Sequence, residues 1–113
     1  MLHPLFETRG VPGTHDINLL QQTLQELRIG SKKIRLPRFD KASDDRTKIE
    51  LWPLFSAPAQ IILLEGWCVG VPPQAKSKIE TPINDLEAEC DPEGIWRKEV
   101  NRQLENAYGE VFA

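Results

Sequence analysis

The feature that most constrains this chain is an uninterrupted apolar run, Ile61–Leu64, which is followed by Glu65 and Gly66. A strand that is apolar at every position has no polar face to turn toward water, so both of its faces need cover. Such strands are typical of the centre of a parallel sheet that has helices on both sides. Residues 60–65 therefore predict a central parallel strand and favour an α/β fold.

Two further elements are predicted upstream of this run. Leucines and isoleucines recur at helical spacing from Ile17, after three side chains that can cap a helix, and Gly30 supplies the stop. Residues 33–36 alternate between polar and apolar, which predicts a short strand ended by Pro37. Residues 38–59 are charged, contain proline and have no clear period, so we expect a loop that is either functional or poorly ordered.

Helices are predicted for the rest of the chain. Thr81-Pro82 is a cap followed by a proline at the first helical position, and Asp91-Pro92 repeats that pattern. The last predicted helix runs to the final residue and carries one apolar stripe; its members are Trp96, Val100, Leu104, Ala107, Tyr108 and Val111. The order of elements is that of an α/β protein, and residues 1–113 show no internal boundary.

Charge and composition exclude several classes of protein. Fourteen basic and seventeen acidic residues give a net charge of -3, which argues against a nucleic-acid-binding surface. No apolar run approaches the ~20 residues of a membrane span, and the first residues do not resemble a signal peptide. Cys68 and Cys90 imply no disulfide framework, so we expect small buried side chains in a reduced, cytoplasmic protein.

One candidate for chemistry is the acidic residue that follows the apolar run. In open parallel sheets, ligands bind beyond the carboxyl ends of the strands. Glu65 is placed there, where a carboxylate can hold Mg²⁺ through water or orient a nucleophile. The alternative is that Glu65 caps a helix or pairs with Arg46.

A second candidate is the glycine-containing turn that precedes the first helix. It carries an arginine, a hydroxyl, an imidazole and a carboxylate, which are Arg9, Thr14, His15 and Asp16. The free N–H groups at a helix N-terminus favour anions, so this turn can bind an anionic ligand. The alternative is that Thr14 and Asp16 only cap the helix and that His15 is solvated.

The third candidate is the charged segment after the first predicted strand, which contains Asp40, Lys41, Asp44, Asp45 and Arg46. Its carboxylates and guanidinium can bind the hydroxyls and the acidic group of a small substrate. The alternative is a solvated charged surface. The tryptophans Trp52, Trp67 and Trp96 are expected to pack in the interior instead of stacking on a ligand.

Several blocks of sequence, taken in order, resemble one known group. They are residues 9–16, residues 36–46, the segment Ile62-Leu63-Leu64-Glu65-Gly66-Trp67, residues 82–87 and residues 100–104. Together they look like the glycerate kinase-like P-loop kinases, relatives of uridine kinase, phosphoribulokinase and pantothenate kinase, and the resemblance spans nearly the whole chain. It implies a P-loop NTPase-like parallel sheet with flanking helices. It also implies transfer of phosphate from ATP to a hydroxyl of a small, glycerate-like metabolite.

The chain departs from that group in one respect. The 113 residues contain no GxxGxGK[ST] phosphate loop, and no lysine stands near Gly10 or Gly13. The resemblance therefore implies the middle portion of a kinase core, a single partial domain over 1–113 that carries the acceptor-substrate half. We expect it to be inactive alone and to bind neither ATP nor Mg²⁺ by itself. The alternative is a non-enzymatic, oligomerising module derived from a kinase.

The resemblance also implies roles for individual residues. Glu65 would lie beside Mg²⁺ as a catalytic residue, with Asp16 as a second catalytic residue. Arg46 would contact an anionic group of the acceptor, and the loop aspartates would accept hydrogen bonds from its hydroxyls. The implied substrate-binding set is Arg9, Thr14, His15, Asp40, Lys41, Asp44, Asp45 and Arg46. A sheet that lacks outer strands exposes its edges and an apolar face, so we expect a homo-oligomer.

Overall fold

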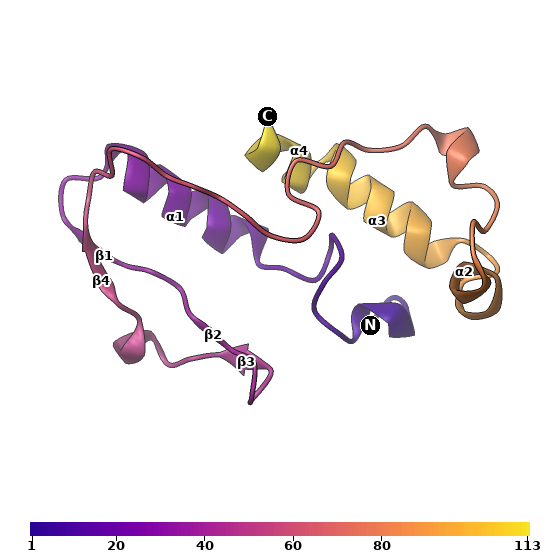
Figure 1. Cartoon of the computed structure of the whole chain (residues 1–113), viewed down its shortest axis with the longest axis horizontal. Helices are drawn as coiled ribbons and strands as arrows, with labels where there is room; N and C mark the ends of the chain where they lie inside the picture. Colours follow the sequence, from indigo (N-terminus) through magenta and orange to yellow (C-terminus); the bar gives the residue numbers. More distant parts are fainter. The chain divides into compact units, whose positions relative to one another are not determined.

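The structure is a computed structural model that describes residues 1–113. These residues form two compact units (Figure 1). The first unit comprises residues 1–17 and 64–113, and the second unit comprises residues 18–63. None of the helices is long and apolar enough to span a bilayer.

The helix predicted from Ile17 is confirmed as α1 (Ile17–Ile29). It ends at Gly30, whose N–H donates a hydrogen bond of 2.8 Å to the carbonyl oxygen of Glu26. A Cβ atom on Gly30 would clash with that same oxygen and would lie 3.1 Å from the Cβ of Ala57. Glycine is therefore required on steric grounds at the end of this helix, because the backbone of residue 30 lies too close to the last helical turn to leave room for a side chain.

The strand predicted over 33–36 is confirmed as β1 (Lys33–Arg35). It pairs antiparallel with β4 (Leu54–Ser56), and Ile34 stands opposite Phe55. Ile34 is 4% exposed, whereas its two neighbours in β1 point outward, as expected for a strand with one buried face. Its partner β4 comes from a segment in which no strand was predicted.

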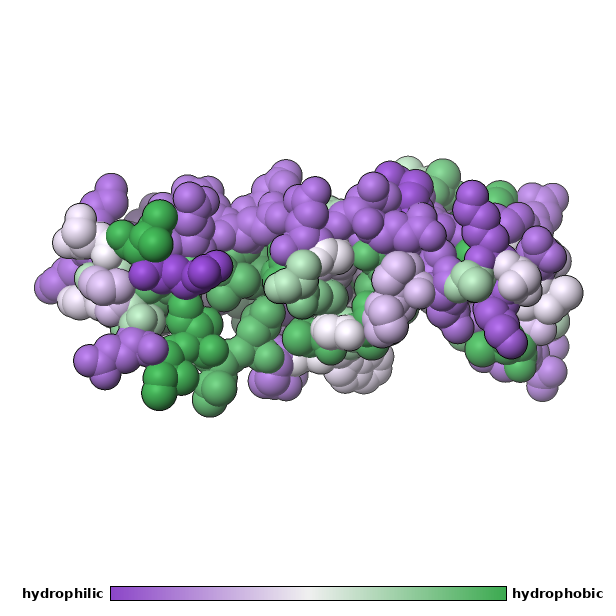
Figure 2. Space-filling view, turned by 90° about the horizontal axis from the view of Figure 1, so that it is seen from above, coloured by the Kyte–Doolittle hydropathy of each residue, from purple (hydrophilic) through white to green (hydrophobic).

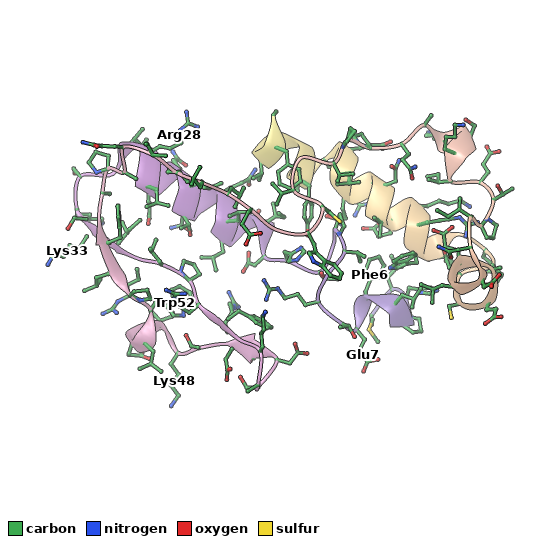
Figure 3. The ribbon with its side chains drawn as sticks, in the orientation of Figure 1. Phe6, Glu7, Arg28, Lys33, Lys48 and Trp52 are labelled. Atoms are coloured by element: carbon green, nitrogen blue, oxygen red, sulfur yellow. The ribbon has the colours of Figure 1, made fainter.

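The segment 38–59 is ordered by side-chain contacts to its own backbone. Beside the 3-10 helix η2 (Ile49–Leu51), the indole Nε1–H of Trp52 donates to the carbonyl oxygen of Thr47 at 2.9 Å (Figure 3). The Arg35 guanidinium donates to the carbonyls of Ile49, Glu50 and Trp52 at 3.3–3.4 Å. Trp52 is 9% exposed, so the prediction that this tryptophan packs in the interior is confirmed.

The central parallel strand predicted over 60–65 is absent from the structure. Both sheets are two-stranded and antiparallel: β1 with β4, and β2 (Phe39–Asp40) with β3 (Asp45–Arg46). Ile61 is 80% exposed and Leu63 is 92% exposed. Figure 2 shows hydrophobic residues among hydrophilic ones at the surface. A strand needs a neighbour to pair with, and β1, the other predicted strand, pairs with β4 instead.

In the first unit, the predicted helix after Thr81 begins later than expected. Its residues are Asp85–Cys90, labelled α2, and the cap is Asn84, whose Oδ1 accepts from the N–H of Glu87 at 2.9 Å. The Glu87 carboxylate in turn accepts from the N–H of Ile83 at 3.0 Å. These two hydrogen bonds at the helix start, one to the Asn84 side chain and one from the N–H of Ile83, account for the boundary at Asn84 and not at Thr81.

The last predicted helix is divided in two. It forms α3 (Ile95–Glu105) and α4 (Ala107–Phe112), separated by Asn106, whose φ of -109° and ψ of -108° are not helical. The Asn106 side chain donates to the carbonyl oxygen of Arg102 at 2.6 Å, which ends α3. On the predicted apolar stripe, Leu104 and Tyr108 are fully buried and the others are partly exposed.

Asp91 joins α3 to the rest of the first unit. The helix starts at Ile95, but the Asp91 carboxylate, 1% exposed, accepts from the N–H groups of Trp96 and Arg97 at 2.8 and 3.1 Å. The Arg97 guanidinium, also buried, lies 3.1 Å from that carboxylate and donates to the carbonyl of Ile79 at 2.7 Å. Burial favours the neutral acid, but these hydrogen bonds and the charges of Arg97 and His3 lower the pKa of Asp91.

A buried amide positions the segment before η3 (Lys76–Lys78). The Asn101 side chain accepts from the N–H of Gln74 at 2.7 Å and donates to its carbonyl oxygen at 3.0 Å. Both polar atoms of a 5% exposed amide are therefore satisfied by one backbone residue, which holds the loop against α3.

The two cysteines are free, in agreement with the absence of a predicted disulfide framework. The prediction that they are buried is wrong, because Cys90 is exposed and Cys68 is only partly covered. Cys68 lies in a turn with φ of +61°, and Cys90 is the last residue of the short helix α2.

Candidate functional site

The turn between Arg9 and Asp16 is closed by its own threonine. The Thr14 hydroxyl accepts from the N–H of Gly10 at 2.8 Å and donates to the carbonyl of Val11 at 2.7 Å. Gly13 has φ of +105°, a left-handed conformation that favours glycine, and the Phe6 ring would lie 3.3 Å from any Cβ placed there. Thr14 therefore has a structural role, as the alternative interpretation of this turn allowed.

A tyrosine from the end of the chain completes this turn. The hydroxyl of Tyr108, on α4, accepts from the N–H of Gly13 at 3.0 Å and lies 2.7 Å from Nδ1 of His15. The two rings meet edge to face, with centroids 5.9 Å apart and an interplanar angle of 65°. Tyr108 is 4% exposed, so its hydroxyl has little access to water and depends on these partners.

The protonation of this pair follows from its surroundings. Burial lowers the pKa of His15, and the nearby positive charge of Arg9 lowers it further. Burial raises the pKa of Tyr108, although hydrogen bonds from the backbone N–H groups of Gly13 and His15 partly oppose that change. At neutral pH the imidazole is therefore uncharged and the phenol is protonated. The prediction that His15 is simply solvated is wrong, since its Nδ1 is held by a buried group.

The remaining residues predicted for this turn are at its edges. Asp16 is exposed and directly precedes α1, and Arg9 is exposed as well. Trp67 is 82% exposed, so the prediction that it packs in the interior is wrong. Its ring lies 3.9 Å from the position that a Cβ of Gly10 would occupy, which places an open aromatic face beside the turn.

Glu65 is exposed and lies in the extended segment just before the turn that contains Trp67. No group of three or more histidine, cysteine or acidic side chains is close enough to hold a metal ion. Mg²⁺ is usually bound by one or two carboxylates together with phosphates and water. In such a site Glu65 would supply one carboxylate.

The charged segment of the second unit forms the β2–β3 hairpin. The Asp40 carboxylate accepts from the Ser43 hydroxyl at 2.8 Å and from the N–H of Ala42 at 3.0 Å. Both hydrogen bonds lower the pKa of Asp40, and the bond from Ser43 has the larger effect. Asp44 has φ of +51°, which aspartate tolerates better than most residues. Asp40 and Asp44 thus shape the turn, as expected for Asx-type turn residues.

The other side chains of the hairpin face solvent. Lys41, Asp45 and Arg46 are exposed, and the Asp45 carboxylate accepts from the N–H of Arg46 at 2.7 Å. Asp45 and Asp40 stand opposite each other in the hairpin register. Of the predicted residues, those of the 9–16 turn and Glu65 therefore belong to the first unit, and those of this hairpin belong to the second.

A separate hollow of about 130 Å³ lies along α3 and is not a candidate site. Among its lining residues, Arg97, Asn101 and Glu87 are each committed to hydrogen bonds with neighbouring backbone groups. The indole Nε1 of Trp96 is buried without a partner, but it is also shielded from solvent and so offers no open donor. The polar residues that line this hollow therefore stabilise the fold.

Tyr108, on α4, contacts the 9–16 turn, and the sequence did not predict this contact. Tyr108 was predicted only as a member of the apolar stripe of the last helix. Its partners Gly13 and His15 lie 95 and 93 residues away along the chain, so no local pattern links them. The only sequence signal was that a tyrosine, with a polar end that needs a partner, occupied a buried position.

Comparison with known proteins agrees with the resemblance seen in the motif blocks. No protein-family model matches the chain. It is 32% identical over 111 residues to the chloroplastic D-glycerate 3-kinase of Arabidopsis thaliana, covering 92% of this chain and 22% of that protein. It is also 32% identical over 76 residues to the "Probable ATP-dependent kinase TDA10" of Saccharomyces cerevisiae, covering 61% of this chain and 26% of that protein.

These alignments fix the relationship and its extent. The chain spans about a quarter or less of the length of the curated relatives that it matches. Over that stretch, the similarity includes most of the chain and accords with the ordered blocks that resembled this group. The chain is therefore homologous to the glycerate kinase-like, ATP-dependent kinases.

Proposed function

We propose that this chain is the acceptor-substrate half of an ATP-dependent kinase that phosphorylates a hydroxyl of a small, glycerate-like metabolite. The observation that carries the proposal is the similarity to D-glycerate 3-kinase over 111 residues. The P-loop NTPase-like fold and the cytoplasmic location are part of the same proposal. The fold rests on the kinase relatives. The location rests on the sequence, whose two cysteines imply no disulfide framework.

The geometry of the 9–16 turn supports an anionic acceptor. An exposed guanidinium, Arg9, stands with a neutral imidazole, His15, directly before the N-terminus of α1. Guanidinium groups bind carboxylates and phosphates in a bidentate manner, and helix N-termini favour negative charge. In the proposal, this turn binds the carboxylate of the metabolite, and Asp16 orients the reacting hydroxyl.

The proposal also assigns acceptor-binding roles to residues of the β2–β3 hairpin in the second unit. The exposed carboxylates Asp44 and Asp45 accept hydrogen bonds from hydroxyls, and Lys41 and Arg46 contact an anionic group. Asp40 contributes through the turn that it stabilises with Ser43. Phosphoryl transfer requires mainly positioning and neutralisation of charge, which are the functions assigned to these groups.

We expect nucleotide binding to require residues other than those of the proposed acceptor site. In the proposal Glu65 supplies one carboxylate to Mg²⁺, and Mg-ATP, when bound, supplies the phosphoryl group. The 113 residues contain no GxxGxGK[ST] motif to hold the phosphates. Calorimetry of this chain with Mg-ATP should therefore show no binding at micromolar concentration. A micromolar dissociation constant would overturn the proposal that the chain is inactive alone.

The acceptor half can be tested without ATP. Titration of the ¹⁵N-labelled chain with D-glycerate should shift the amide resonances of the 9–16 turn, with a dissociation constant of roughly 1 mM, about -4 kcal/mol. Arg9→Gln should abolish the shifts. Arg28→Gln removes an equally exposed arginine from the last turn of α1 and serves as the matched control. Equal shifts with glycerol, which lacks the carboxylate, would refute an anionic acceptor.

A second candidate function is a non-enzymatic, oligomerising module. The observation that favours it is the exposure of large apolar side chains, with Ile61 80%, Leu63 92% and Trp67 82% exposed. Large apolar side chains exposed to solvent are typical of surfaces that contact another chain. Light scattering should then report a homo-oligomer, and a monodisperse monomer at high concentration would rule this function out. Replacing Leu63 with Ser should shift the distribution toward monomer.

A further inference from the structure

The hydrogen bonds of the Tyr108 hydroxyl indicate which atom donates to which. A phenol oxygen has one hydrogen to donate and two lone pairs that accept. The backbone N–H of Gly13 donates to this oxygen at 3.0 Å and occupies one lone pair. The same oxygen lies 2.7 Å from Nδ1 of His15. If Nδ1 were the donor, the hydroxyl hydrogen of this 4% exposed tyrosine would have no acceptor among these contacts, so we infer that the hydroxyl donates to Nδ1.

We propose that Tyr108 is a positioning residue that holds His15 in the tautomer with hydrogen on Nε2, so that His15 acts on the acceptor substrate as a neutral hydrogen-bond donor. If Tyr108 donates to Nδ1, then Nδ1 carries no hydrogen, and the ring hydrogen of the neutral imidazole is on Nε2. The edge-to-face packing of the two rings also restricts rotation of the imidazole.

The electrostatic surroundings oppose the charged form of the imidazole. Protonation would place an N–H on Nδ1 and so remove the acceptor to which the hydroxyl of Tyr108 donates. Burial lowers the pKa of His15, and the charge of Arg9 lowers it further. The group packed on the other side, Tyr108, is itself uncharged, because burial raises the pKa of its phenol.

The consequence for chemistry is a division of roles. A neutral imidazole with hydrogen on Nε2 donates to an oxygen of the acceptor, and it cannot accept the proton of a hydroxyl through that same nitrogen. His15 would therefore bind and polarise an oxygen, while a carboxylate serves as the proton acceptor. This role for His15 rests on the proposed function, whereas the tautomer and the clamp by Tyr108 are properties of the free chain.

The tautomer is measurable on the chain without any ligand. Long-range ¹H–¹⁵N correlation spectra of the imidazoles at pH 7.5 distinguish the protonated from the unprotonated ring nitrogen. We expect His15 to show an unprotonated Nδ1 and a protonated Nε2. The second histidine of the chain, His3, lies 3.6 Å from Asp91 and serves as an internal reference in the same spectrum. A His15 ring with hydrogen on Nδ1 would overturn the proposal outright.

Tyr108→Phe tests whether the hydroxyl causes this state. The phenyl ring keeps the packing and removes only the hydrogen bonds, so a mixture of tautomers should appear and the pKa of His15 should rise toward its ordinary value of 6.5. Phe112→Leu is the matched control, because Phe112 packs edge to face on Tyr108, with ring centroids 5.9 Å apart, and has no hydrogen-bonding group in its side chain. It should leave both readouts unchanged.

The outcomes separate this inference from the kinase proposal. An unchanged tautomer and pKa in Tyr108→Phe would refute the positioning role even if the chain binds D-glycerate. Conversely, a confirmed tautomer with no D-glycerate binding would leave the clamp intact and overturn the proposed function. If Tyr108→Phe unfolds, the wild-type spectrum still decides, because the proposal requires the Nε2 hydrogen there.

Discussion

Replacement of Asp91 by asparagine is expected to be among the most damaging single changes in the first unit. The carboxylate is 1% exposed, and it accepts from two backbone N–H groups of α3 and from the Arg97 guanidinium. Asparagine keeps the shape and one acceptor oxygen, but it removes the charge. The buried guanidinium of Arg97, 6% exposed, then has no counter-ion.

The size of the effect follows from that loss of a partner. Removing one member of a buried ion pair costs about 3–5 kcal/mol, since the other charge remains buried and uncompensated. Arg97 retains its hydrogen bonds to the carbonyls of Ile79 and Glu80, so we expect the lower end, about 3 kcal/mol. Small domains have a total stability of about 5–15 kcal/mol, so α3 should open measurably.

The assay is urea unfolding combined with amide hydrogen exchange at the start of α3. The N–H groups of Trp96 and Arg97 should lose most of their protection in Asp91→Asn. The control is Arg102→Gln, which breaks an exposed pair with Glu99 at 2.6 Å and should change neither readout. The double variant Asp91→Asn with Arg97→Met should regain part of the stability. An effect of Asp91→Asn no larger than that of the control would refute the reasoning.

Three further predictions concern pH and local structure. The pKa of Asp91 is held below 3.8, so its stabilisation is complete above that pH and is lost as the pH falls through the lowered pKa; acid unfolding monitored by circular dichroism should show this loss in the wild type and not in Asp91→Asn. Asn84→Ala removes the cap of α2 and should cost about 1 kcal/mol in urea unfolding, with rapid amide exchange at Glu87. Gly30→Ala places a Cβ against the Glu26 carbonyl and should lower stability by about 1–3 kcal/mol, whereas an unchanged melting temperature would contradict the steric account.

Elements with local signals agree well between sequence and structure. The helix from Ile17 with its stop at Gly30 was predicted from spacing and one glycine, and the strand at 33–36 was predicted from alternation. Both signals lie within a few residues of the structure that they specify, so they need no knowledge of distant partners. The boundary at Thr81 failed by three residues because two caps compete there, and Asn84 has the Glu87 partner that Thr81 lacks.

Elements that depend on a distant partner could not be predicted in this way. The apolar run Ile61–Leu64 has the composition of a central strand, yet no strand pairs with it in the structure. The partner of β1 is β4, from a segment whose sequence shows no strand period. Strand pairing depends on two segments of the chain. The hydrophobicity of one segment indicates only that its side chains favour burial, and not which strand it pairs with.

The candidate site shows the same division. The order of residue types in the 9–16 turn and the motif blocks identify the kinase relationship without coordinates, because homology is recorded in the chain itself. Only the fold brings the Tyr108 hydroxyl to the N–H of Gly13 and to Nδ1 of His15, across 95 and 93 residues. A buried hydroxyl bonds to whatever donors and acceptors the packing places within about 3 Å. Tertiary contacts therefore decide the tautomer and the protonation of the His15 imidazole. The sequence by itself determines only that a histidine and a tyrosine are present at these positions.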